Sequence, residues 1–372
     1  MPGAVFVDGM KDPTTGLRRH AAKAGLSLGC HPDPGPDGHW GPAYLLRREF
    51  DALVSNAFHW NVLQPDGPGR WNWEPSDRAV RLARELGLPL RGHAILWYQM
   101  IPGWFTGLGN RGLMEKYLVE HVRAVVSRYR GKIVSWDVAN ETVWPAHGRA
   151  DGMRADLLME AFGEEYLDLA FRVAEESDPG AELVLNEALL VHRDQAPQRA
   201  AFTGLLERLA GRGVPVHSAG IQAHIGWADG QPMGPLDARA AAGLLDWIGD
   251  TGLGANITEL DVFDAALDPD PAVRDLEVAD LYECFLDGIL GADCLRGIFF
   301  WGCGDASSWY NTYVRRVMPG CLPHPDWRSR PLLFDADYRR KPAYFAVARC
   351  LGRAMLAGVE QDPTQIVENA GV

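Results

Sequence analysis

The sequence lacks paired cysteines, long apolar stretches and an excess of basic residues, which are features of zinc-binding, membrane-spanning and nucleic-acid-binding proteins. Its six cysteines form no CxxC pair and show no zinc-site spacing, so we interpret them as buried thiols. No stretch approaches the roughly 18 consecutive apolar residues that a membrane span needs. Basic residues are in the minority, and the formal net charge of -13 disfavours nucleic acid as a partner. These shortages argue against zinc-binding, membrane-spanning and nucleic-acid-binding proteins.

The chain also lacks a low-complexity linker, which predicts a single domain for its 372 residues. A hydrophobic fraction of 47% is close to the globular average and is enough for a sizeable core. We expect the domain to cover residues 26–356, between an N-terminal extension over 1–25 and a C-terminal tail over 357–372. The first 25 residues hold no apolar stretch of signal-peptide length behind a basic start, so we expect a cytoplasmic location.

Eight short apolar runs, rich in branched and aromatic residues, alternate with helical patterns along the chain. The runs are too continuous for surface strands and indicate strands that are buried on both faces of a parallel sheet. Eight such strands alternating with helices predict an α/β fold, the closed (β/α)8 TIM barrel. The predicted strands span residues 26–29, 53–60, 89–97, 133–141, 182–187, 218–225, 255–262 and 297–301. The predicted helices span residues 77–86, 113–129, 155–176, 198–209, 236–248, 273–290 and 342–355.

Barrel enzymes carry their chemistry at the C-terminal ends of the strands. Seven of the eight predicted strands end in polar or aromatic side chains, which is more than stability requires. We therefore predict a substrate site at this rim. The residues concerned are Asn56, His59, His93, Trp97, Asn140, Glu141, Asn186, Glu187, Gln222, His224, Glu259, Asp261, Trp301 and Asp305.

Two of the rim residues form a carboxylate pair, Glu141 in WDVANE and Glu259 in ITELDV. Glycoside hydrolysis needs two carboxyls beside the sugar bond, one protonated to assist the leaving group and one ionised. His224 ends the neighbouring strand and is expected to keep Glu259 ionised by hydrogen bonding. This indicates that Glu141 is the acid and Glu259 the ionised partner. Retention and inversion both stay open, because they differ in the separation of the two carboxyls.

The residues around this pair fit a carbohydrate or glycoside substrate. Asn140 is placed to bind a sugar hydroxyl, and three tryptophans offer flat faces to a pyranose ring: Trp97, Trp301 and Trp309. We expect Asp137 and Asp261 to support the site by holding arginines or backbone amides. A zinc or magnesium site built from His93, His224 and Glu259 is less consistent with the asparagine and glutamine between them, which suit sugar hydroxyls.

The motifs RGHAILW, WDVANE, GIQAH, ITELDV, FFWGCGDASSW, LLFD and KPAYFAV stand in an order that resembles glycoside hydrolase family 10, the xylanase family. The resemblance covers about residues 26–356. It implies a retaining double displacement without a cofactor, with Glu141 as acid/base and Glu259 as nucleophile. It also implies that Asn56 binds the next sugar on the glycone side. The pocket around the cleaved sugar is implied to consist of His93, Trp97, Asn140, Gln222, His224, Trp301 and Trp309.

Several positions depart from the family pattern. The chain has Ser55 where the family has glutamate, His59 for lysine, Tyr98 for histidine, Met100 for glutamine and Glu187 for aspartate. Most of these positions contact glycone sugars in typical members. The loss of long hydrogen-bond donors there predicts an altered glycone site beside an intact catalytic pair.

The stretch 310–330 is longer than is typical of the family and is expected to lie over the mouth of the site, where loops tune specificity. A xylan-type oligosaccharide or a related glycoside is the expected substrate. Two alternatives stay open, a transglycosylase acting on a small glycosylated metabolite and a non-catalytic carbohydrate-binding barrel. The sequence does not predict an oligomeric state.

Overall fold

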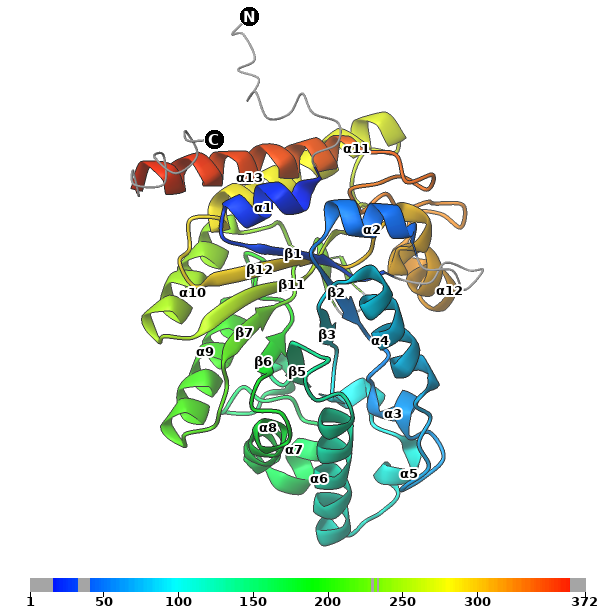
Figure 1. Cartoon of the computed structure of the whole chain (residues 1–372), viewed down its shortest axis with the longest axis vertical. Coiled ribbons are helices and arrows are strands. Elements are labelled where there is room, and N and C mark those ends of the chain that lie inside the picture. The colour runs from blue at the N-terminus through cyan, green and yellow to red at the C-terminus, as the bar shows by residue number, and fades with distance from the viewer. Residues whose placement is uncertain (1–15, 33–40, 229–230, 233, 362–372) are drawn as a thin grey trace, which may run out of the picture.

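A closed ring of eight parallel strands forms the centre of the computed structural model, which describes residues 16–32, 41–228, 231–232 and 234–361 (Figure 1). The ring closes because β12 pairs with both β1 and β11. Two short strands, β4 (Leu96–Trp97) and β8 (His224–Ile225), pair with β5 and β11 at the end of the barrel that carries the site. The ring strands are β1 (Ser27–Cys30), β2 (Ala52–Ser55), β3 (Leu90–Gly92), β5 (Ser135–Asn140), β6 (Glu182–Glu187), β7 (Ser218–Ile221), β11 (Gly254–Val262) and β12 (Leu295–Phe300). The predicted barrel is confirmed.

Helices follow the strands and cover the outside of the ring (Figure 1). The main ones are α1 (Leu17–Lys23), α2 (Ala43–Glu49), α4 (Glu74–Leu86), α6 (Arg111–Arg128), α8 (Glu165–Ser177), α9 (Ala196–Gly211), α10 (Ala238–Asp250), α11 (Pro271–Ile289) and α13 (Pro342–Gln361). Shorter segments are α3 (Trp60–Leu63), α5 (Gly103–Thr106), α7 (Leu157–Phe162) and α12 (Arg315–Val317). The strands β9 (Trp227–Ala228) and β10 (Gln231–Pro232) form a separate antiparallel pair.

Some element boundaries differ from the sequence prediction. The helix predicted over 77–86 ends at Leu86 as expected, followed by Gly87 at φ 68°, but it begins at Glu74. Ser76 therefore lies inside the first turn, where its hydroxyl bonds the Tyr129 hydroxyl at 2.7 Å. The helix predicted over 155–176 is broken at Gly163, whose φ of 61° is a left-handed conformation that favours glycine. The strand predicted over 53–60 ends at Ser55, and Trp60 begins α3.

Both ends of the described chain pack against each other on one side of the barrel. Figure 1 shows α1 beside α13, and Leu17 and Ala21 of α1 are buried in the main hydrophobic core. The buried carboxylate of Glu49 accepts from the Leu17 backbone N–H at 2.9 Å and from the Tyr344 hydroxyl at 3.0 Å. The core therefore begins ahead of Leu26, inside the stretch predicted as an N-terminal extension.

Two further expectations concern membrane-spanning helices and the cysteine thiols. Within the ranges that the structure describes, no helix has both the length and the apolar character needed to span a bilayer. Cys30, Cys303 and Cys350 are buried as expected. Cys284 is exposed, so the interpretation of all six as buried thiols is wrong for this residue.

Candidate active site

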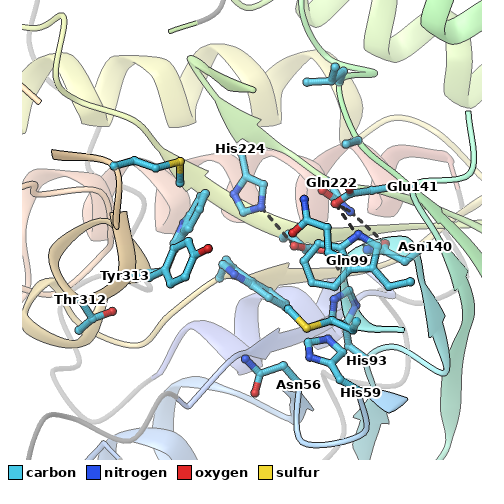
Figure 2. A pocket seen from close by; sticks show the side chains of 18 of the residues that line it. Asn56, His59, His93, Gln99, Asn140, Glu141, Gln222, His224, Thr312 and Tyr313 are labelled. Atoms are coloured by element: carbon cyan, nitrogen blue, oxygen red, sulfur yellow. Dashed lines mark hydrogen bonds and ion pairs between the residues drawn. The ribbon is translucent and has the colours of Figure 1, made fainter. Parts of the chain in front are cut away.

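A pocket of about 850 Å³ opens where the barrel strands end (Figure 2). Figure 2 shows Glu141, Asn140 and Gln222 close together, with Asn56 and His59 across the pocket and Thr312 and Tyr313 at its edge. All of the predicted catalytic and substrate-binding residues line this pocket: Asn56, His59, His93, Trp97, Asn140, Glu141, Gln222, His224, Glu259, Trp301 and Trp309.

Glu259 projects from β11 into a cluster of hydrogen-bond donors. Its Oε1 accepts from Asn186 Nδ2 at 2.8 Å, and its Oε2 lies 3.1 Å from His224 Nε2. His93 Nδ1 lies 3.8 Å from Oε1. Burial by itself raises the pKa of Glu259, but the charges of His93 and His224 and these hydrogen bonds outweigh it and hold the pKa below its ordinary value. The carboxyl is therefore ionised and oriented, as a nucleophile requires.

His224 links this carboxylate to Asp261, two residues further along β11. Its Nδ1 lies 2.7 Å from Asp261 Oδ1. Burial lowers the pKa of His224, but the two carboxylates outweigh it and raise the pKa to about 10. The ring is thus an imidazolium at neutral pH and donates to both acids. Asp261 is buried and also accepts from Trp309 Nε1 at 2.7 Å and the Tyr310 hydroxyl at 2.9 Å. Within the described part of the chain it therefore supports the site through the side chains of a histidine, a tryptophan and a tyrosine, and not through the arginines or backbone amides that were expected.

His93 is held from behind by a second aspartate. Its Nδ1 lies 2.8 Å from Asp137 Oδ2, and Arg91 donates to the other oxygen of Asp137. Burial lowers the pKa of His93, but the charges of Glu259 and Asp137 outweigh it and raise the pKa. Asp137 holds an arginine, as the sequence predicts for it, and fixes the His93 ring against the pocket.

Glu141 sits in different surroundings at the end of β5. Its backbone has a φ of 55°, and its carbonyl accepts from Arg154 Nε at 2.7 Å. Burial raises the pKa of Glu141, Arg154 opposes the rise from 3.8 Å, and the negative charge of Glu259 adds to it. The net result is a pKa above the ordinary value. The two carboxyls therefore have pKa values displaced in opposite directions, which separates an acid from a nucleophile.

Three amides connect the two carboxyls. Asn140 Oδ1 accepts from Asn186 Nδ2 at 2.8 Å and from Gln222 Nε2 at 3.0 Å. Gln222 Nε2 also reaches Glu141 Oε1 at 3.3 Å, while Asn186 Nδ2 reaches Glu259. Each carboxyl thus receives a donor from the same network, which keeps their relative orientation constant.

Two other predicted rim acids stand behind the pocket. Glu187 is fully buried, and burial raises its pKa to about 8. Burial likewise raises the pKa of Asp305 to about 7, although Lys341 Nζ lies 3.0 Å away. Asp305 also accepts from the Leu332 backbone at 3.0 Å, so it supports the segments that follow β12.

The pocket lining includes His59 and Met100 at positions where the sequence departs from the family pattern. His59 is 6% exposed, and its Nε2 has no hydrogen-bond partner among the described residues. Burial holds the pKa of His59 well below its ordinary value, with help from the charges of His93 and His31, so the ring is neutral. Met100 accepts a hydrogen bond from Asn61 at 3.3 Å through its sulfur.

The segment after β12 lies at the mouth of the pocket, as expected for residues 310–330. It forms a short π-helical turn (Tyr310–Val314), α12 and a 3₁₀ turn (Pro319–Cys321). Its pocket-lining residues are Asn311, Thr312, Tyr313, Arg316 and Met318. The segment is anchored at its far end, where Arg274 pairs with Asp264 at 3.1 Å and lies 3.9 Å from the centre of the Trp327 ring.

Other residues of the site were not among the predicted ones. Trp144, Ala188, Leu189 and His192 line the pocket after β5 and β6. Arg154 stands behind Glu141 and is 3% exposed. The available signal was their position just after predicted strand ends, but loop conformation decides which of such residues face the pocket.

Comparisons with known proteins agree with this geometry. The model of the family described as "Glycosyl hydrolase family 10" matches residues 16–350. The chain is 28% identical over 319 residues to "Endo-1,4-beta-xylanase 3" of Hypocrea jecorina, covering 82% of this chain and 80% of that protein. It is also 28% identical over 306 residues to "Endo-1,4-beta-xylanase B" of Thermotoga neapolitana, with 82% and 81% covered.

Solved structures resemble the barrel over nearly its whole length. The native xylanase 10B of Thermotoga maritima superposes with a TM-score of 0.79 at 27% identity, covering 92% of this chain and 100% of that one. Xylanase 10B of Thermotoga petrophila RKU-1, solved in complex with xylobiose, superposes with the same TM-score at 26% identity, covering 92% and 99%.

Proposed function

The chain belongs to glycosyl hydrolase family 10 and is a glycoside hydrolase, and we propose that it cleaves a β-glycosidic bond of a xylan-type oligosaccharide or a related glycoside with retention. The observation that carries the proposal is the pair of carboxyls on one pocket, with the pKa of Glu141 raised and that of Glu259 lowered. The xylanase activity in the names of the relatives supports a xylan-type glycone.

In the first step, the Glu259 carboxylate attacks the anomeric carbon while the bond to the leaving oxygen breaks. Glu141 transfers its proton to that oxygen, so the leaving group departs as a neutral alcohol. The product is a glycosyl ester of Glu259. His224 and Asn186, which bond Glu259, keep the carboxylate aimed at the carbon.

In the second step, Glu141 acts as a base. Once Glu259 is esterified, its negative charge no longer adds to the effect of burial on the pKa of Glu141, and the pKa falls. The Glu141 carboxylate then removes a proton from water, the water attacks the anomeric carbon, and Glu259 leaves as a carboxylate. Two inversions at one carbon give net retention.

A covalent adduct tests the mechanism directly. Mixing the protein with a 2-fluoro aryl β-xylobioside should add the mass of one fluorinated xylobiosyl unit. The fluorine slows both steps by destabilising their oxocarbenium-like transition states, but an activated aryl leaving group keeps formation of the ester faster than its hydrolysis. Intact-mass spectrometry of wild type and Glu259→Ala measures this. An adduct on both proteins, or inverted product from an ordinary substrate, would refute the proposal. If the folded wild-type protein forms no adduct, the same experiment is repeated with glucosides, galactosides and arabinosides.

We also propose that the glycone site differs from that of a typical xylanase. The neutral His59, with its unpaired Nε2, and the thioether of Met100 stand where the family pattern has long polar donors. A pocket with fewer donors leaves some hydroxyls of a xylan chain without partners, and this weakens binding of the transition state. A short oligosaccharide or a small glycoside suits such a site better.

Restoring the donors should raise activity on xylo-oligosaccharides. We expect His59→Lys with Met100→Gln to increase kcat/KM for xylotriose at least about tenfold, because each new donor satisfies a sugar hydroxyl in a buried setting. The two single variants are the matched controls and should each give part of the gain. Steady-state product formation measures it. No gain in the double variant would place the altered recognition elsewhere in the pocket.

A further inference from the structure

Four side chains form a distinct part of the pocket, which we call the aglycone wall: Trp144, Ala188, Leu189 and His192. They follow β5 and β6, whereas Asn56 and His59 follow β2, and β3 lies between β2 and β5 in the ring. Glu141 directly follows β5 and protonates the oxygen of the leaving group, so the leaving group must lie beside it. The aglycone wall is therefore the surface that the leaving group meets.

The aglycone wall offers few hydrogen-bond partners. Ala188 and Leu189 have none in their side chains. His192 Nε2 already accepts from the Gly226 backbone at 3.1 Å, and its Nδ1 is buried. Burial lowers the pKa of His192 to about 4, so the ring is uncharged at neutral pH. What remains for a ligand is the indole of Trp144 and an apolar surface.

The indole of Trp144 is held in place by a buried cation. The guanidinium carbon of Arg154 lies 4.5 Å from the centre of the Trp144 ring and 4.0 Å from that of Tyr98. Arg154 is also tied to the Glu141 carbonyl at 2.7 Å. The orientation of the indole is thus coupled to the backbone of the acid/base, and the ring is a preformed surface.

The part of the aglycone wall that follows β6, formed by Ala188, Leu189 and His192, is also held in place. The buried carboxyl of Glu187 accepts from the Val143 and Ala188 backbone N–H groups, both at 3.0 Å, and so holds the two halves together. Arg199 donates to the His192 carbonyl at 2.7 Å. Leu189 has a φ of 66°, a costly conformation for a bulky side chain that surrounding structure must maintain. A strained leucine that lines a pocket indicates that the surrounding structure holds this surface in one conformation.

We propose that the aglycone wall receives an apolar, ring-containing aglycone in place of a second sugar. A sugar aglycone brings several hydroxyls that lose water on binding, and the described residues of the wall leave most of them unpaired. A flat hydrocarbon ring instead gains contact with Trp144 and Leu189 without that cost. The inference rests on the proposed function and names the class of its leaving group.

The test compares glycosides that differ only in the aglycone. Methanol and 2-phenylethanol are both primary alcohols with similar leaving-group strength, so their β-xylosides report aglycone contacts rather than bond strength. We expect kcat/KM for the 2-phenylethyl β-xyloside to exceed that for the methyl β-xyloside by roughly 10–200-fold. It should also exceed that for xylobiose, although a sugar hydroxyl is the better leaving group. If the adduct experiment selects another sugar, the same series is built on it.

Variants distinguish a specific loss of aglycone contacts from a general loss of activity. Trp144→Ala should lower the 2-phenylethyl to methyl ratio roughly tenfold, and Trp144→Phe should keep most of it. The ratio cancels any disturbance of Arg154 and Glu141, because both substrates need the same proton transfer. Tyr44→Ala removes an aromatic ring that is 63% exposed on α2 and is not among the residues that line this pocket, and it should leave the ratio unchanged.

The inference would be overturned if xylobiose were turned over faster than the 2-phenylethyl xyloside. It would also be overturned if Trp144→Ala lowered kcat/KM equally for both xylosides. Absence of turnover and of adduct with every sugar would instead refute the proposed function. In that case calorimetry with the same two xylosides still decides the inference. Tighter binding of the 2-phenylethyl compound that Trp144→Ala abolishes would support it, and equal affinities would reject it.

Discussion

Replacing Glu259 with alanine is expected to abolish turnover of every glycoside, whatever its leaving group. The covalent step needs a carboxylate at the anomeric carbon, and His93, His224 and Asn186 lie against the Glu259 carboxylate and orient it. Loss of a nucleophile costs roughly 10⁶-fold in kcat in a well-studied covalent enzyme, and a loss of that order is expected here. Initial rates on an aryl β-glycoside measure it.

Azide distinguishes a lost nucleophile from a damaged fold. The anion should enter the space left by the carboxyl in Glu259→Ala, attack from the same face and give an α-glycosyl azide, which NMR identifies. Glu176→Ala is a suitable control, because Glu176 is 63% exposed on α8 and forms an exposed ion pair with Arg123 at 3.3 Å. Its rate should equal that of wild type. Substantial turnover by Glu259→Ala without added azide would contradict the nucleophile assignment.

Replacing Glu141 should have an effect that depends on the leaving group. An alkyl or sugar leaving group needs a proton in the transition state, so Glu141→Ala should lose roughly 10²–10⁴-fold in kcat/KM on such substrates. A dinitrophenyl glycoside needs no proton, and its first step should be nearly unaffected. The measurement is kcat/KM across leaving groups of increasing acidity. Equal losses on all of them would refute the acid assignment.

The pH profile reports the same two groups. Glu141 must be protonated, so activity is lost as the pH rises through its raised pKa, and Glu259 must be ionised, so activity is lost as the pH falls through its lowered pKa. The expected kcat/KM profile is a bell that is wider than two ordinary glutamates would give. In Glu141→Ala, the alkaline limb should disappear on the dinitrophenyl glycoside.

The barrel and the catalytic rim could be predicted from the sequence because both depend on local patterns. Apolar runs of strand length alternate with helical periods, and parallel strands bring their C-terminal ends to one edge. That rule is enough to bring Glu141 and Glu259, far apart in the chain, into one pocket. The broken helix at Gly163 and the early start of α4 were missed, because single turns at helix ends depend on tertiary contacts.

By itself, the sequence determined which strand ends lie at the pocket and which two carboxyls line it together. Only the tertiary structure decided how their pKa values separate, because that depends on burial and on the distances to His93, His224 and Arg154. It also decided that Trp144 and Leu189 line the pocket. Those side chains lie on loops that are held by buried contacts with Arg154, Glu187 and Arg199. Such contacts join distant segments and produce no periodic pattern of residues from which the sequence could predict them.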